Sequence, residues 1–448
     1  MKKAFILSVL ILSILVSGVL APLSTAEALF EAEPPKAVPA PNENDFLKKN
    51  GSIDYDAYYN AYDLWATANS EKTLAPGAAD SLNGYFFAAS REVLAKQDQK
   101  NKVFSPVNVY LALSMLSEIT SGSTRDEILD LLNAESIEDL RAQAKAIFLS
   151  IHENDGQTTS IPAASVWLRN DTLYKPDALE ILSKDYFASS YTGEMGSEEY
   201  DAMIQKWLTD ATEGLLEEQA KNISFDPDTL IALASSLYFK AGWSNEFNKS
   251  ATEESVFHSI SGDTTAEFMR KSSTDTYYWS DHFGAVALSL TNGGKMWFFL
   301  PDEGVSPESL FEDGDALALA RNPYEWTMQK RLIVHKSIPK FDVTGENDLV
   351  DALWNLGIHA AFNPDLSDFT PITDIPEIAV SKVQHDARVK IDEEGVEAAA
   401  YTVIMALETS ARPPEEEMDF IADRPFAFII TSQDHLPLFS GIVNHTEK

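Results

Sequence analysis

The chain has 448 residues, no cysteine and a 44% share of hydrophobic residues, and its 34 Lys and Arg against 70 Asp and Glu give a formal net charge of −36. The hydrophobic share is typical of a folded globular protein, and the lack of cysteine excludes disulfides and thiolate chemistry. The charge disfavours nucleic acid and anionic membranes as partners; it indicates either a surface adapted to salt or solubility by self-repulsion.

The first residues resemble a secretion signal. Lys2 and Lys3 precede an uncharged, mostly apolar run over residues 4–20, and Ala26-Glu27-Ala28 supplies a cleavage site of the A-x-A type. We therefore predict that residues 1–28 are a signal peptide and that the protein is secreted. The run is also close to the length that spans a membrane, so an uncleaved, cell-surface anchor is the alternative.

Two further regions follow the signal. Residues 29–80 combine a Pro- and Glu-rich linker with a tyrosine-rich extension, which we expect to pack on the main domain. Its aromatic residues are Tyr55, Tyr58, Tyr59, Tyr62 and Trp65. Residues 81–448 show no repeat, low-complexity tract or further boundary, which predicts one domain.

Local signals place several elements in this domain. Ser105-Pro106 predicts the start of a buried helix, with Ser as N-cap and Pro in the first turn. Thr124 and Glu127 have the spacing of a capping box ahead of a second helix. Short apolar runs predict buried strands at 230–239, 296–300, 332–338, 427–430 and 438–443. Helices prevail early and strands late, so the predicted class is α+β with large sheets.

The sequence shows no catalytic or metal-binding motif. G-x-S-x-G, H-E-x-x-H and the phosphate-binding G-x-x-x-x-G-K-[ST] do not occur, and no two His have helical ligand spacing. Ser337 and Lys340 fit S-x-x-K, but they lie in a strand-like run, whereas an active serine of that motif opens a helix. We predict no cofactor, no metal and no enzymatic activity.

One segment has an unusual pattern. From Glu393 it begins with Glu, Gly and small residues, continues with β-branched residues and ends in an exposed, Pro-bounded piece at Pro413. Alternate residues from Val396 to Ala406 are all small or apolar, which would let this face slide between strands of a sheet. The segment is therefore compatible with a loop and with a central strand; an ordinary hairpin or edge strand is the alternative.

Motifs in register across about 82–448 resemble the serpin family. They are Phe104-Ser105-Pro106, Trp207 and Thr212, Tyr238-Phe239-Lys240 with Trp243, Phe298-Phe299-Leu300-Pro301, Pro339-Lys340-Phe341, Leu356-Gly357-Ile358, Ser381 with His385, Glu393 to Ala400, Phe420 to Phe426, and Pro437 to Asn444. The resemblance implies the serpin fold, with a mainly helical first half, large β-sheets and an exposed reactive-centre loop.

It also implies a function without catalytic residues. A target serine protease cleaves the loop and becomes trapped as an acyl-enzyme in a covalent 1:1 complex, while the loop inserts into the central sheet of a metastable, monomeric inhibitor. The small residues of the hinge favour an inhibitory member. The alternatives are a non-inhibitory carrier or chaperone, a serpin directed at cysteine proteases, and an unrelated exported hydrolase.

The resemblance transfers roles to individual residues. The hinge comprises Glu393, Glu394, Gly395, Val396, Glu397, Ala398, Ala399, Ala400, Tyr401 and Thr402. A polar cluster where the sheet opens comprises Ser105, Asn108, Ser235 and His385, with Asn108 expected to reach His385. The top of the sheet carries Lys340, Glu393 and Trp243, with an ion pair between the first two.

The family spacing also predicts the scissile bond. With Glu393 as the first residue, the seventeenth is Thr409, which places the bond between Thr409 and Ser410. A Thr at this place suits an elastase-like or subtilisin-like protease. A slip of one or two residues would give Glu408 or Leu407 instead, and Arg412 is a poor candidate because Pro413 follows it.

Overall fold

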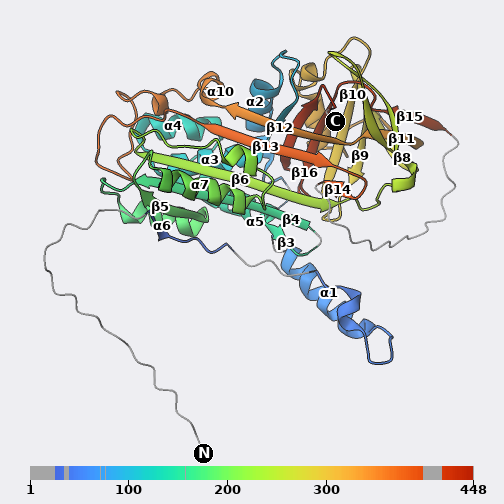
Figure 1. The fold of residues 1–448 in the computed structure, drawn as a ribbon, viewed down its shortest axis with the longest axis horizontal. Coiled ribbons are helices and arrows are strands. Elements are labelled where there is room, and N and C mark those ends of the chain that lie inside the picture. Colours follow the sequence, from blue (N-terminus) through green and yellow to red (C-terminus); the bar gives the residue numbers. More distant parts are fainter. Residues whose placement is uncertain are drawn as a thin grey trace, which may run out of the picture.

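The structure is a computed structural model that describes residues 26–34, 40–70, 72–75, 77–156, 158–396 and 416–446. Within these ranges ten α-helices are placed: α1 Tyr55–Ser70, α2 Asn83–Leu94, α3 Pro106–Glu118, α4 Gly122–Leu131, α5 Ile137–Ile151, α6 Pro176–Asp185, α7 Glu198–Ala211, α8 Glu217–Ala220, α9 Asp315–Arg321 and α10 Val350–Asn355. Figure 1 shows most of these helices gathered around one elongated sheet.

That sheet, here sheet A, has the order β1-β5-β4-β6-β14-β13-β12, with β3 added on β4. Its strands are β1 Glu27–Phe30, β3 Glu153–Asn154, β4 Thr158–Arg169, β5 Ala188–Gly193, β6 Ile231–Gly242, β12 Phe341–Asp348, β13 Gln384–Ile391 and β14 Gly395–Val396. The β4–β5 pair is parallel and the other pairs are antiparallel.

The second sheet, sheet B, has the order β15-β11-β8-β9-β10-β16-β17-β2, with β7 paired to β8. Its strands are β2 Lys102–Phe104, β7 Glu253–Ser259, β8 Gly262–Trp279, β9 Phe283–Ser289, β10 Lys295–Pro301, β11 Gln329–Pro339, β15 Glu417–Ile421, β16 Phe426–Thr431 and β17 Pro437–Val443. The five predicted strands are confirmed as β6, β10, β11, β16 and β17. The mixture of helices and two large sheets confirms the α+β class.

Helix α3 forms the centre of the core, as its sequence predicts. Ser105 is its N-cap and accepts a hydrogen bond from the Asn108 N–H, and Pro106 occupies the first turn. Nearly every residue of α3 is buried, because the helix packs against α4, α5, β6 and β17 at once. A helix that is apolar on all sides needs such surroundings.

The predicted capping box of the next helix is wrong. Helix α4 already begins at Gly122, with Ser121 before it as N-cap. The Thr124 hydroxyl accepts a hydrogen bond from the Asp368 N–H at 3.0 Å, and the Glu127 carboxylate accepts from the backbone of residues 359 and 360 at 2.7 Å. Both side chains therefore hold a distant loop, which a local motif cannot reveal.

The N-terminal extension also differs from expectation, since its helix does not pack on the domain. Helix α1 stands out from the body in Figure 1, and the residues Tyr55, Tyr59 and Tyr62 are 48%, 54% and 44% exposed. The extension is attached at its two ends, where Ala40 N–H donates to the Asp155 carbonyl and Leu74 N–H to the Asp434 carboxylate.

Strand β1 pairs with β5 at the edge of sheet A and contains Glu27 and Ala28, so it spans the predicted end of the signal peptide. The leader itself lies largely outside the described residues, and its cleavage stays a prediction. Across the described ranges, no helix combines the length and the apolar character needed to cross a membrane.

Candidate functional site

The chain reverses direction at the end of β13 and enters sheet A a second time. Asp392 N–H donates to the Gly395 carbonyl at 3.0 Å, and the Asp392 carboxylate accepts from the N–H groups of Glu394 and Gly395 at 2.8 and 3.2 Å. These bonds form a tight turn that directs β14 back between β13 and β6.

Strand β14 is only two residues long, yet both of its neighbours pair with it. Gly395 lies opposite Gly242 and Val396 opposite Ala241 on β6, while Val396 lies opposite Ile391 on β13. A side chain at position 395 would place its Cβ 2.3 Å from the Ala241 carbonyl oxygen, so only glycine fits this close approach.

Beyond β14 the two flanking strands do not pair with each other. Within the described residues, β6 has ladders only with β4 and β14, and β13 only with β12 and β14. Residues 231–240 of β6 therefore face residues 384–390 of β13 without a β-ladder between them. We call this unpaired stretch between the two strands the slot; β6 and β13 run side by side along it in Figure 1.

The two faces of sheet A at the slot differ in their surroundings. Odd-numbered residues of β6 and β13, such as Phe239 and Val389, belong to the main core, whereas Ala232 and Ala234 pack toward α7. Val396 is 2% exposed and points into the main core. This is the side on which the sequence alternation places the small and apolar residues of the loop.

An ion pair closes the sheet where β14 begins. Lys340 Nζ lies 2.9 Å from the Glu393 carboxylate, which also accepts a hydrogen bond from the Thr252 hydroxyl at 2.7 Å. Burial alone would raise the pKa of Glu393, but the hydrogen bonds from Lys340 and Thr252 hold this pKa below its usual value. The carboxylate is 8% exposed, so it depends on these partners.

Trp243 holds the same turn from the side of β6. Its indole N–H donates to the Asp392 carbonyl at 2.8 Å, and its backbone N–H donates to the Glu394 carbonyl at 2.9 Å. Lys249 forms an ion pair with the Glu394 carboxylate. Lys340, Glu393 and Trp243 are thus brought together, while Asp392, which organises the turn, was not singled out in the sequence because one Asp among many carries no signal.

We expect Glu393→Gln to destabilise the protein by about 1–2 kcal/mol, because it removes the charge that Lys340 faces at a buried position. The free energy of guanidinium unfolding measures the effect. Glu267→Gln is the matched control, since Glu267 contacts the same lysine at 3.1 Å but is 59% exposed; its expected loss is under about 0.5 kcal/mol. Equal losses in both variants would contradict a special role of Glu393.

The polar cluster lies beneath the lower part of the slot. The Ser105 N–H donates to Nε2 of His385 at 3.0 Å, and the Ser105 hydroxyl donates to the Leu438 carbonyl at 2.6 Å. Burial lowers the pKa of His385 to about 4, so the ring is neutral at pH 7 and Nε2 is free to accept.

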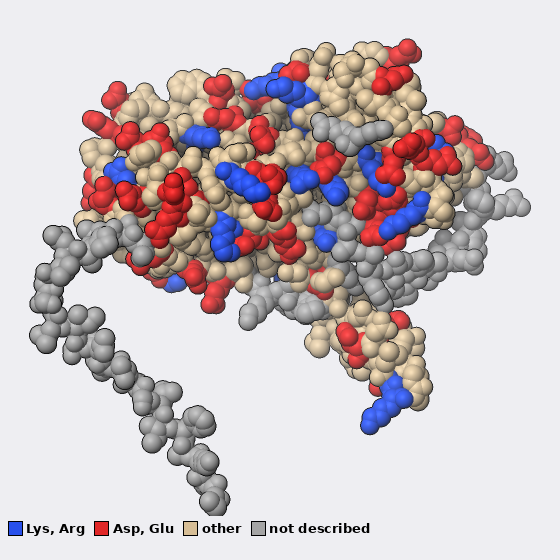
Figure 2. Space-filling model, viewed as in Figure 1, with Lys and Arg blue, Asp and Glu red and all other residues tan. Residues whose placement is uncertain are grey.

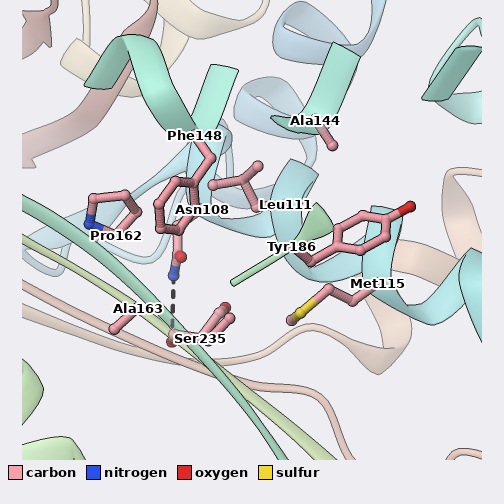
Figure 3. Close-up of a pocket in the computed structure, with 10 residues that line it drawn as sticks. Asn108, Leu111, Met115, Ala144, Phe148, Pro162, Ala163, Tyr186 and Ser235 are labelled. Atoms are coloured by element: carbon pink, nitrogen blue, oxygen red, sulfur yellow. Dashed lines mark hydrogen bonds between the residues drawn. The ribbon is translucent and has the colours of Figure 1, made fainter. Parts of the chain in front are cut away.

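The expected contact between Asn108 and His385 is wrong. The Asn108 side-chain amide donates to the Ser235 carbonyl at 3.4 Å, the bond drawn in Figure 3. The backbone of the N-cap residue Ser105 already occupies the acceptor on His385, and Asn108 lies one turn along α3, opposite β6. The cluster therefore consists of two hydrogen bonds that join α3 and its N-cap to sheet A: Ser105 bonds to His385 on β13, and Asn108 bonds to Ser235 on β6.

A small cavity of about 10 Å³ adjoins the link to β6, about the volume of one water probe. Its lining comes from α3, α5, β4 and β6, with the addition of Tyr186, and is mainly apolar (Figure 3). Among the described residues no group of three or more His, Asp or Glu has the geometry of a metal site.

The remaining predicted site residues lie outside the described residues. These are the hinge residues Glu397, Ala398, Ala399, Ala400, Tyr401 and Thr402 and the predicted scissile bond between Thr409 and Ser410.

Comparison with known proteins gives one consistent result. The family model described as serpin (serine protease inhibitor) matches residues 81–446. Serpin-Z1C of Triticum aestivum is 30% identical over 78% of this chain and 89% of its own, and Serpin-ZX of Arabidopsis thaliana is 28% identical over 77% and 91%.

Solved structures agree on the fold. The native, stressed conformation of Arabidopsis AtSerpin1 has a TM-score of 0.70 at 25% identity and covers 83% of this chain and 100% of its own. The native state of the thermophilic serpin tengpin has a TM-score of 0.71 at 24% identity, over 82% of this chain and 94% of its own. Together with the family match over most of its length, this shows that the chain belongs to the serpin family.

Proposed function

We propose that this serpin is a secreted, single-use inhibitor that traps serine proteases of elastase-like or subtilisin-like specificity as covalent 1:1 complexes. Family membership supports the type of function, namely protease inhibition without enzymatic turnover. The observation that carries the inhibitory mechanism is the slot, because along it β6 and β13 share no described β-ladder, while two residues of a strand already pair with both of them at one end.

The register of β14 defines what further insertion would require. Continued antiparallel pairing sets residues 398, 400 and 402 opposite Phe239, Leu237 and Ser235 of β6, on the core side. The chain carries Ala398, Ala400 and Thr402 at these places. Small side chains enter this packed layer without steric conflict, and Thr402 would come level with the polar cluster between Ser235 and His385.

The energy for trapping would come from completing the sheet. Strand edges at the slot carry N–H and C=O groups without ladder partners within the described residues. Each added backbone hydrogen bond contributes on the order of 1 kcal/mol net. A loop held outside by its intact peptide bond leaves this energy unused, so the uncleaved protein is metastable in the proposed mechanism.

The surface charge limits the kind of partner. Figure 2 shows acidic side chains spread over the whole visible face, with lysines and arginines interspersed among them. A net charge of −36 favours the approach of a basic protease over that of an acidic one and disfavours polyanions.

Denaturing gel electrophoresis after mixing with an elastase and with a subtilisin tests the proposal. We expect a band that survives detergent, with the summed mass of inhibitor and protease, and a released peptide that begins at Ser410. Complete cleavage without such a band, for both proteases, would contradict the inhibitory mechanism for these specificities. A rise in thermal stability upon cleavage then separates a serpin that inserts its loop without trapping from a carrier type that does not insert it.

A further inference from the structure

We propose that the projecting helix α1 is an exosite, a second contact surface for the protease that attacks this serpin. The contact surface is a row of three exposed tyrosines, Tyr55, Tyr59 and Tyr62, here called the tyrosine stripe. The inference rests on the proposed inhibitory function and names a surface, separate from the scissile bond, that would select the protease.

The N-terminal extension is anchored at the end of sheet A where β14 enters. Val396 on β14, Ala241 on β6 and Thr158 on β4 lie in one row across the sheet. The Thr158 N–H donates to the Asp155 carboxylate at 2.9 Å, and the Asp155 carbonyl accepts from the Ala40 N–H at 2.9 Å. The first anchor of the extension is therefore one tight turn away from the row that contains β14.

The second anchor lies at the same end of the sheet. The Leu74 N–H donates to the Asp434 carboxylate in the turn between β16 and β17. That turn adjoins the turn between β9 and β10, because β10 pairs with β16, and Thr291 in the latter turn donates its N–H to the Gly242 carbonyl of β6 at 2.9 Å. Helix α1 is thus held at the end of the molecule where β14 leads into the segment with the predicted scissile bond (Figure 1).

The tyrosine stripe is arranged in advance of any binding. Its members follow one another at intervals of four and three residues, so they share one face of the helix. The rings of Tyr55 and Tyr59 stack with centroids 6.0 Å apart, and Tyr62 packs on Trp65 at 5.4 Å. Rings that are already ordered lose less entropy when a partner binds. Tyrosine is also enriched at protein interfaces, because its ring supplies apolar area and its hydroxyl a hydrogen bond.

Apolar exposure is concentrated on this extension. Its exposed large hydrophobic residues are Leu47, Tyr55, Tyr59, Tyr62 and Leu64. A contiguous exposed patch of this kind marks a site of interaction more often than single exposed residues do. Figure 2 shows the projecting part as a mostly uncharged surface, in contrast to the charged body.

Charge determines which partner fits this patch. The chain has a net charge of −36, and residues 40–70 contain five carboxylates against two lysines. A second copy of this chain or an anionic membrane would be repelled, whereas a basic protein would be attracted. Asp56 and Asp63 are exposed and seven residues apart, so both lie along the same flank of the stripe. A basic protease that attacks the chain beyond β14 is therefore the occupant that fits both the charge and the position.

The rate constant for covalent complex formation with a basic elastase tests the exosite. We expect the triple variant Tyr55→Gln, Tyr59→Gln, Tyr62→Gln to lower this rate constant about tenfold, because aromatic anchors carry much of the binding energy of an interface. The inhibitor consumed per protease trapped should not change, since sheet A is intact. Asp56→Asn combined with Asp63→Asn should lower the rate constant about threefold at low salt, and the difference should disappear at high salt.

Leu64→Gln is the matched control. Leu64 is 73% exposed on the same helix, but it lies nine residues from Tyr55 and therefore on the opposite face. Its rate constant should stay within about twofold of the wild-type value. Equal rate constants for the triple variant and Leu64→Gln would overturn the exosite. So would a wild-type dimer that the triple variant converts to monomer in sedimentation velocity, because the stripe would then join two copies of this chain.

A binding measurement separates failure of the exosite from failure of the proposed inhibition. If the wild type forms no covalent complex with the elastase, the inhibitory function fails for this protease. The dissociation constant for an elastase whose nucleophilic serine is replaced by alanine then still decides the exosite. We expect the triple variant to bind this elastase about tenfold more weakly than Leu64→Gln, and equal binding would overturn the proposal.

Discussion

Val396→Arg is expected to convert this serpin from an inhibitor into a substrate. Val396 is 2% exposed and packed in the main core, so a guanidinium there would be buried without an opposite charge. The variant should therefore lose the two paired residues of β14, so that insertion has to start anew after cleavage. This delay lets the protease complete hydrolysis, and the inhibitor consumed per protease trapped should rise more than about tenfold. Gel densitometry of covalent complex against cleaved inhibitor gives this ratio.

Two further variants separate this effect from misfolding. Ala398→Arg introduces the same charge at the next core-side position, beyond the residues already inserted, and should give the same conversion. Val396→Ala introduces neither a charge nor added volume and should remain an inhibitor. Normal inhibition by a folded Ala398→Arg variant would show that the core side of the slot does not receive the loop.

We also expect His385 to make the protein less stable in mild acid. Burial lowers the pKa of this ring to about 4 in the folded protein, against about 6.5 when unfolded. Between these values the unfolded chain binds more protons, so the free energy of unfolding falls as the pH falls from about 7 to 4. The full loss contributed by His385 is about 3 kcal/mol.

A second group works in the opposite direction in the same pH range. Burial and the neighbouring Asp155 raise the pKa of Glu153 to about 7, although the hydrogen bond from Asn292 opposes the shift. The folded protein then binds the extra proton, so this contribution to stability is present at low pH and is lost as the pH rises toward 7. The contributions of His385 and Glu153 therefore partly cancel when the free energy of unfolding of the wild type is plotted against pH.

Difference measurements resolve them. Unfolding free energies of the wild type and of His385→Gln at pH 5 and pH 7.5 should show that the wild type loses more stability in acid, since glutamine keeps an acceptor for the Ser105 N–H but does not titrate. Glu153→Gln should lose more in acid than the wild type, because it lacks the compensating group. A His385→Gln variant with the wild-type acid loss would show that this ring does not titrate between the two states.

The sequence was most informative where a pattern is local or repeated along the chain. The N-cap at Ser105, the five apolar strands and the register of family motifs all predicted features that the structure confirms. The side chains of Thr124 and Glu127 were assigned wrongly because their partners, Asp368 and His359, lie far away in the sequence, and a motif read locally cannot anticipate such partners. Asn108 was assigned to His385 from the family resemblance, whereas its amide donates to the Ser235 carbonyl.

The same reason explains what the sequence could not show about the site. The alternation of the loop predicts which face is small, but only the observed pairing of Val396 with Ala241 and Ile391 shows where the segment enters sheet A. The exposure of helix α1 was likewise hidden, because a tyrosine-rich stripe has the same pattern whether or not a domain covers it.

The two residues of β14 have a kinetic consequence. Starting a strand between two others is the slow event, since it orders a chain end before cross-strand bonds are made. In this protein the first rungs are present before any cleavage, and the turn at Asp392 fixes their alignment. In the proposed mechanism only elongation of the strand then remains, one residue at a time in the register that β14 already has with β6 and β13. Whether the protease is trapped then depends on the rate of strand elongation relative to the rate of deacylation, and the rate of strand initiation no longer matters.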